Sequence, residues 1–87
     1  MTAPPRDWMT DGAWPGGRLA RDAPAAAVKL AATARRVGEV VEQLGPEAVA
    51  AGANVDRDEL DELLAGTAWP TLHLIVGLET YLEETLW

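Results

Sequence analysis

The stretch from Gly45 to Pro70 constrains this chain more than any other part of the sequence. It reads GPEAVAAGANVDRDELDELLAGTAWP, and turn-forming residues divide it into two short segments of helical composition. Pro46 suits the first turn of a helix, Asn54 tolerates the left-handed conformation of a tight turn, and Gly66 is typical of a helix end. This punctuation predicts two short helices joined by a tight turn.

The second short helix is predicted to begin after Asp56, which is a good N-cap residue, and to end at Gly66. Glu59 completes a capping-box-like pair with Asp56, and Val55 and Leu60 are placed to form a hydrophobic staple. The helical period of about 3.6 residues then turns three leucines inward and a row of carboxylates outward. The leucines are Leu60, Leu63 and Leu64, and the carboxylates are Asp58, Glu59, Asp61 and Glu62.

Two longer helical patterns flank this unit. Apolar residues at steps of three and four predict one helix from about Pro24 to Leu44 and another from after Trp69-Pro70 to about Leu82. The first apolar stripe is Leu30, Ala34, Val37, Val41 and Leu44, and the last is Leu72, Ile75, Leu78 and Leu82. Leu86 and Trp87 are expected to fold back on this last helix. No segment shows a strand pattern, so the predicted fold class is all-α, a compact bundle of four to five helices.

Residues 1–23 are predicted to form an irregular N-terminal arm before a helical domain at 24–87. Prolines and glycines interrupt every regular period in the arm. It nevertheless contains Trp8 and Trp14, which a purely disordered tail rarely does. We prefer the interpretation that the arm is flexible or loosely packed and that its tryptophans latch onto the helical body. The other interpretation is that Arg18 and Arg21 reach DNA phosphates or a minor groove.

Composition argues against several classes of function. The chain has no cysteine, no serine and a single histidine, His73, so disulfides, thiolate zinc sites and serine or cysteine nucleophiles are excluded. The carboxylates fall mostly on predicted helix surfaces, so we expect no enzyme activity, no cofactor and no metal. No apolar run approaches the ~20 residues that span a membrane, and the N-terminus is unlike a signal peptide. A soluble cytoplasmic protein is therefore expected.

Charge is distributed unevenly along the chain. Residues 1–44 carry six basic and five acidic side chains, whereas residues 45–87 carry one arginine and nine acids, and the total is −7. Nucleic-acid binders usually have a basic footprint, which here would come from the first half. The best candidates for phosphate contacts are Lys29, Arg35 and Arg36, with Arg18 and Arg21 in the arm. The simpler interpretation is a solvated helix face on which Glu39 pairs with Arg35.

The second half of the chain also matches a known pattern. The matching positions are Val49-Ala50, Asn54-Val55, Leu60, Leu64-Ala65-Gly66, Trp69-Pro70, Leu72, Ile75, Leu78-Glu79, Leu82 and Leu86-Trp87. These residues resemble the lambda-repressor-like (Xre-type) helix-turn-helix domains, especially the short forms of actinobacteria and their phages. The resemblance is strongest over 45–87 and extends back to about residue 24. It departs from the family at Asn54 and Glu83, where glycine is common.

The resemblance implies a DNA-binding transcriptional regulator whose helix after Asp56 enters the major groove. Carried over by position, the contact residues are Arg57, Asp58, Glu59, Asp61 and Glu62, with Thr67 in the following loop. Family members usually have small polar and basic residues here, whereas this chain has one arginine, which Asp61 is placed to pair with. One carboxylate can accept a hydrogen bond from cytosine N4, but several carboxylates together repel the phosphates of DNA.

Two kinds of partner therefore stay open. One is double-stranded DNA, and the other is a basic protein surface on which the acidic helix docks. A homodimer is a third prediction. It would double the basic side chains Lys29, Arg35 and Arg36 that could contact DNA. In another form of this prediction, tryptophan and leucine residues at the two chain ends form its interface.

Overall fold

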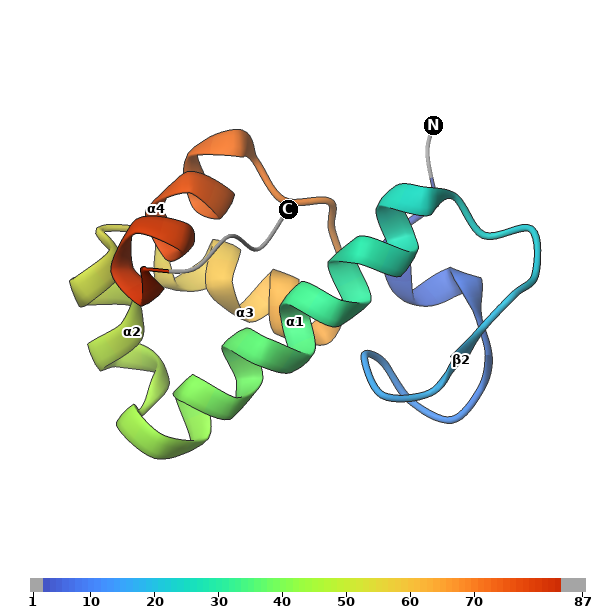
Figure 1. Ribbon diagram of the computed structural model, residues 1–87, viewed down its shortest axis with the longest axis horizontal. Coiled ribbons are helices and arrows are strands. Elements are labelled where there is room, and N and C mark those ends of the chain that lie inside the picture. Colours follow the sequence, from blue (N-terminus) through green and yellow to red (C-terminus); the bar gives the residue numbers. More distant parts are fainter. Residues whose placement is uncertain (1–2, 84–87) are drawn as a thin grey trace.

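Four α-helices and a small N-terminal hairpin make up residues 3–83, the part of the chain that the computed structural model describes (Figure 1). In chain order the elements are the 3₁₀-helix η1 (Pro5–Trp8), the strands β1 (Met9–Asp11) and β2 (Arg18–Leu19), and the helices α1 (Ala25–Leu44), α2 (Pro46–Ala53), α3 (Arg57–Ala65) and α4 (Leu72–Leu82). The predicted helical architecture is thus confirmed, with four helices.

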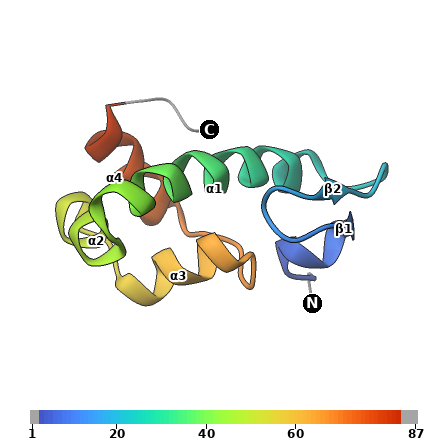
Figure 2. The same cartoon turned by 90° about the horizontal axis from the view of Figure 1, so that it is seen from below.

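Helix α1 runs along the length of the molecule, with α2 and α4 at one end and the hairpin at the other (Figure 1). Seen from below, α1 and α3 form two layers, and the hairpin lies past the end of α3 and alongside the N-terminal part of α1 (Figure 2). All four helices contribute aliphatic side chains to one core, whose largest fully buried leucine and valine members are Leu30, Val37, Val49, Leu60, Leu63, Leu74 and Leu78. This packing fixes which face of α3 is left for solvent.

Local capping chemistry sets the limits of α2 and α3 as predicted. Asn54 adopts the left-handed conformation, with φ 57° and ψ 47°, and ends α2. The Asp56 carboxylate accepts hydrogen bonds from the backbone N–H groups of Asp58 at 2.8 Å and Glu59 at 3.3 Å, which satisfies donors that a helix start leaves unpaired. Gly66 ends α3 with φ 70° and ψ 26°. The unit α2–turn–α3 therefore begins and ends where the sequence indicates.

Two positions of the predicted apolar stripes are wrong. Leu44, in the last turn of α1, is 54 % exposed, and Leu72, the first residue of α4, is 79 % exposed. Leu74 is buried instead, together with Ile75 and Leu78. In α4 apolar residues occur on both sides of Ile75, so the steps of three and four fit two neighbouring stripes. Packing against the other helices decides between the two.

The prediction that the chain contains no strand is also wrong. Strands β1 and β2 pair antiparallel, with Met9 opposite Leu19 and Asp11 opposite Arg18, and the register shifts between the two pairs. Gly12, at φ 78°, begins the turn that joins them. Strands of three and two residues are too short to show an alternating pattern, which explains why the sequence gives no signal.

Hydrogen bonds fasten the hairpin and η1 to the end of α3. The Trp14 indole N–H donates to the Leu63 carbonyl at 3.1 Å, and the Arg6 backbone N–H donates to the Gly66 carbonyl at 2.9 Å. The Trp69 indole N–H, in turn, donates to the Ala3 carbonyl at 2.8 Å, which satisfies the polar end of this half-buried side chain. The N-terminal segment therefore packs on the helical body, where it contacts the end of α3 and the loop that follows it.

Two further sequence-based expectations concern membranes and the C-terminus. Within residues 3–83 no helix combines the length and the apolar character needed to traverse a bilayer. The expected folding back of Leu86 and Trp87 falls outside the described residues.

Candidate interaction surface on helix α3

Buried leucines on one side of α3 set the chemistry of its other side. Leu60 and Leu63 are fully buried, whereas five residues on the remaining surface of the helix are exposed. These five, which we call the α3 face, are Arg57, Asp58, Asp61, Glu62 and Ala65. Three carboxylates and one guanidinium make this face predominantly acidic, as the sequence predicts.

Arg57, the single cation of the α3 face, contacts two carboxylates. Its Nε donates to Asp61 Oδ1 at 3.0 Å, which confirms the pair predicted from their spacing, and its Nη1 lies 3.6 Å from Glu47 Oε1 on α2. The arginine side chain is 43 % exposed, and Glu47 is 91 % exposed. Exposed pairs of this kind contribute only about 0–1 kcal/mol, so a partner that offers Arg57 better acceptors can displace them.

Glu59 and Thr67 lie at the margin of the α3 face. Glu59 is half-buried, and its Oε2 accepts from the Thr71 hydroxyl at 3.3 Å, so this side chain ties α3 to the start of α4. Thr67 is exposed, and its backbone N–H donates to the Glu62 carbonyl at 3.1 Å. Of these two predicted contact residues, Thr67 is thus placed at the surface, whereas Glu59 serves the junction of two helices.

Arg35 of α1 borders a surface hollow with Leu64 of α3, but the side chains of Arg35 and Arg36 bind groups outside that helix. Arg35 donates through Nη1 to the Pro15 carbonyl at 3.1 Å, and Arg36 Nη1 lies 3.5 Å from Glu39 Oε2. The predicted Arg35–Glu39 pair is therefore replaced by Arg36–Glu39, because the arm offers Arg35 a carbonyl. Lys29 is exposed on the first half of α1.

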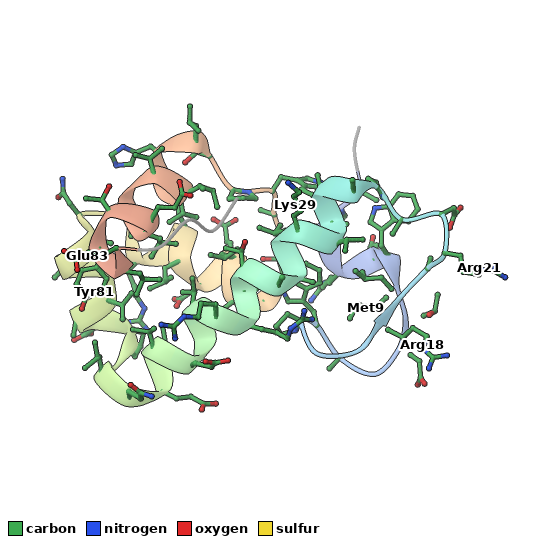
Figure 3. All side chains as sticks on the ribbon, in the orientation of Figure 1. Met9, Arg18, Arg21, Lys29, Tyr81 and Glu83 are labelled. Carbon is green, nitrogen blue, oxygen red and sulfur yellow. The ribbon has the colours of Figure 1, made fainter. Side chains whose placement is uncertain are left out.

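The two arginines predicted to act from the arm lie far along it. Figure 3 shows Arg18 and Arg21 at the end of the molecule away from α2 and α4. In both ribbon views the segment that carries Arg21 lies beyond the last turn of α3 (Figures 1 and 2). The structure thus separates this pair from the α3 face.

Arg6 is a cation near the α3 face that the sequence did not indicate. It is exposed, its backbone is bonded to Gly66, and it borders a surface hollow with Trp14 and Ala65. No local pattern links position 6 to position 66, since the contact depends on the docking of the whole arm. A run of prolines before a tryptophan is the only hint that residues 4–8 adopt a fixed conformation.

Within residues 3–83, no group of three or more His, Cys, Asp or Glu side chains is arranged to hold a metal ion. The α3 face, the Thr67 loop and Arg6 form an exposed, charged surface, which suits the binding of another macromolecule. No protein-family model matches the chain, and no curated protein or solved structure matches it.

Proposed function

We propose that this chain is a small helix-turn-helix DNA-binding regulator of transcription, with α3 as its recognition helix. The observation that carries the proposal is the α2–turn–α3 unit itself. An eight-residue helix and a nine-residue helix are joined through the left-handed Asn54, and the outer side of the second helix is exposed along its whole length. The resemblance to lambda-repressor-like domains over residues 45–87 supports the same function.

The size of α3 is compatible with a DNA groove. Nine residues at about 1.5 Å each give a helix about 14 Å long, and the major groove is about 12 Å wide. With the first turn over the bases, Arg57 is the residue for a guanine and Asp58 the residue for a cytosine N4. Arg57 first exchanges Asp61 and Glu47 for the base, at a cost of about 0–1 kcal/mol for each of the two pairs.

Electrophoretic shift of genomic DNA fragments tests this proposal. Because affinity for DNA depends on cations that neutralise phosphates and release counterions, we expect binding at ~50 mM salt and much weaker binding at ~200 mM. Arg57→Ala should lower the affinity for the preferred fragment by about 1–3 kcal/mol and relax the sequence preference. Absence of any shift at ~50 mM salt, with a folded protein, would contradict the proposal.

A second candidate function is the binding of a basic protein surface through the α3 face. It is favoured by one observation, namely that Asp61 and Glu47 both contact the only cation of that face. Asp58 and Glu62 are exposed there. Their negative charges repel the phosphates of DNA, whereas they attract lysine and arginine side chains.

The double variant Asp58→Lys with Glu62→Lys separates the two candidates. If DNA is the partner, the variant should bind DNA more tightly at low salt, because two repulsive charges become attractive. If a basic protein is the partner, the variant should lose it in a pull-down. Unchanged recovery of the protein partner would count against the second candidate.

The predicted homodimer has an independent test. A twofold assembly would double Lys29, Arg35 and Arg36, and this would offset part of the repulsion between an acidic chain and DNA. Sedimentation at micromolar concentration, with and without DNA, measures the assembly directly. A monomer under both conditions would exclude the homodimer.

A further inference from the structure

We propose that the N-terminal arm is part of the DNA-binding surface and that Arg6 contacts a phosphate at the edge of the groove. The inference rests on the proposed DNA-binding function and adds a residue and an element to it. Its starting point is the docking of η1 on the end of α3, which places position 6 beside the loop that follows the recognition helix.

The docking holds the Arg6 backbone in a fixed place. The Arg6 N–H donates to the Gly66 carbonyl at 2.9 Å, and the Trp14 indole donates to the Leu63 carbonyl at 3.1 Å. Pro5, the residue before Arg6, is buried. These contacts use the backbone of Arg6 and the side chains of its neighbours, so the guanidinium itself is left for another partner.

The charge of Arg6 is also available. None of the ion pairs within residues 3–83 involves Arg6, whereas Arg36 and Arg57 each pair with a carboxylate. Arg6 lies near the C-terminal end of α3, where the helix dipole places partial negative charge. A cation at this end reduces the repulsion that a phosphate would otherwise meet there.

The dimensions of α3 put a phosphate row near this end. A helix about 14 Å long that crosses a groove about 12 Å wide has its last turn at the groove edge, where the sugar-phosphate backbone runs. The last turn of α3 carries the exposed Glu62 and Ala65 and no basic residue, and Arg6 borders the same hollow as Ala65, together with Asp7. Arg6 therefore supplies the cation that the last turn of α3 lacks.

Arg21 provides a matched control. It is also an exposed arginine of the N-terminal segment, but it lies at the far end of the molecule (Figure 3). The experiment compares the full chain with its Arg6→Ala, Arg6→Lys and Arg21→Ala variants. Fluorescence anisotropy measures the binding of a labelled DNA duplex, the best fragment from the shift assay, over a salt series from ~25 to ~200 mM, and circular dichroism confirms that each variant is folded.

The expected result is a change in salt dependence that is specific to Arg6. Arg6→Ala should lower the slope of log K against log salt by about 1, and it should weaken matched and mismatched duplexes by the same factor. Arg6→Lys should keep the slope of the parent chain, and so should Arg21→Ala.

Two different failures are distinguishable. If the parent chain binds no duplex at any salt concentration, the proposed function is refuted and the role of Arg6 falls with it. If the parent chain binds and Arg6→Ala keeps the full slope, only the role of Arg6 is refuted. Equal losses in Arg6→Ala and Arg21→Ala would also overturn it, because the effect would then reflect total charge.

Discussion

Gly66 joins the end of α3 to the N-terminal arm, and replacing it tests how strongly the two are coupled. Its φ of 70° is in the left-handed region, and a Cβ added there would lie 2.6 Å from Cγ of Trp14 and 2.7 Å from Cδ2. Gly66→Ala should therefore act through two separate effects. One is backbone strain in α3, and the other is displacement of the Trp14 ring from its site.

The size of each effect follows from the contacts. An alanine in the left-handed conformation costs about 1 kcal/mol relative to glycine. A displaced Trp14 loses its hydrogen bond to the Leu63 carbonyl, worth about 1 kcal/mol, and part of its burial, worth about another 1 kcal/mol for a half-buried ring. The total of about 3 kcal/mol corresponds to a Tm decrease of about 12–24 °C for a domain of this size.

Urea denaturation of a double-mutant cycle measures the two effects separately. In the parent chain Gly66→Ala should cost about 3 kcal/mol, but in a Trp14→Ala background only the backbone strain of about 1 kcal/mol should be left. Gly16→Ala is the control, because a Cβ there meets nothing within 4 Å and its backbone angle is ordinary. If Gly66→Ala costs the same in both backgrounds, the contact between the arm and α3 does not stabilise the fold.

Three further substitutions test other parts of the fold, each by urea denaturation. Gly77→Ala should destabilise by about 1–3 kcal/mol, because its Cβ would lie 2.8 Å from the Ala53 carbonyl where α4 crosses α2; an unchanged midpoint would exclude that close approach. Asp56→Ala should cost about 1 kcal/mol through loss of the α3 cap, and Asp56→Asn should restore most of it. Leu74→Ala should cost about 2–5 kcal/mol and Leu72→Ala less than about 0.5 kcal/mol, and the reverse order would reinstate the stripe that the sequence predicts.

The helices could be predicted from sequence because their limits depend on local chemistry. The cap at Asp56, the left-handed turn at Asn54 and the end at Gly66 each need only a few neighbouring residues. The choice between Leu72 and Leu74 as a core residue is different. It depends on how α4 is rotated against the other helices, and the spacing of apolar residues leaves that rotation undetermined.

The candidate surface was predictable in its charge but not in its extent. The period of α3 exposes Asp58 and Glu62, and the Arg57–Asp61 pair follows from their separation by one turn. Arg6 was missed because its neighbours in space are sixty residues away in the chain, and this contact forms only when the arm docks. The hydrogen bond from Arg35 to Pro15 escaped prediction for the same reason.

The way the arm is held also decides what tryptophan fluorescence reports in this protein. Trp8 and Trp14 belong to the arm, and Trp69 donates to Ala3, so these three of the four tryptophans lie in or against the arm. The fully buried side chains of the helices are aliphatic apart from Thr33, and none of them is aromatic. Emission from these three indoles is therefore sensitive to where the arm is, whereas far-ultraviolet circular dichroism follows the helices. The protein thus carries its own optical label for release of the arm, and no dye has to be attached.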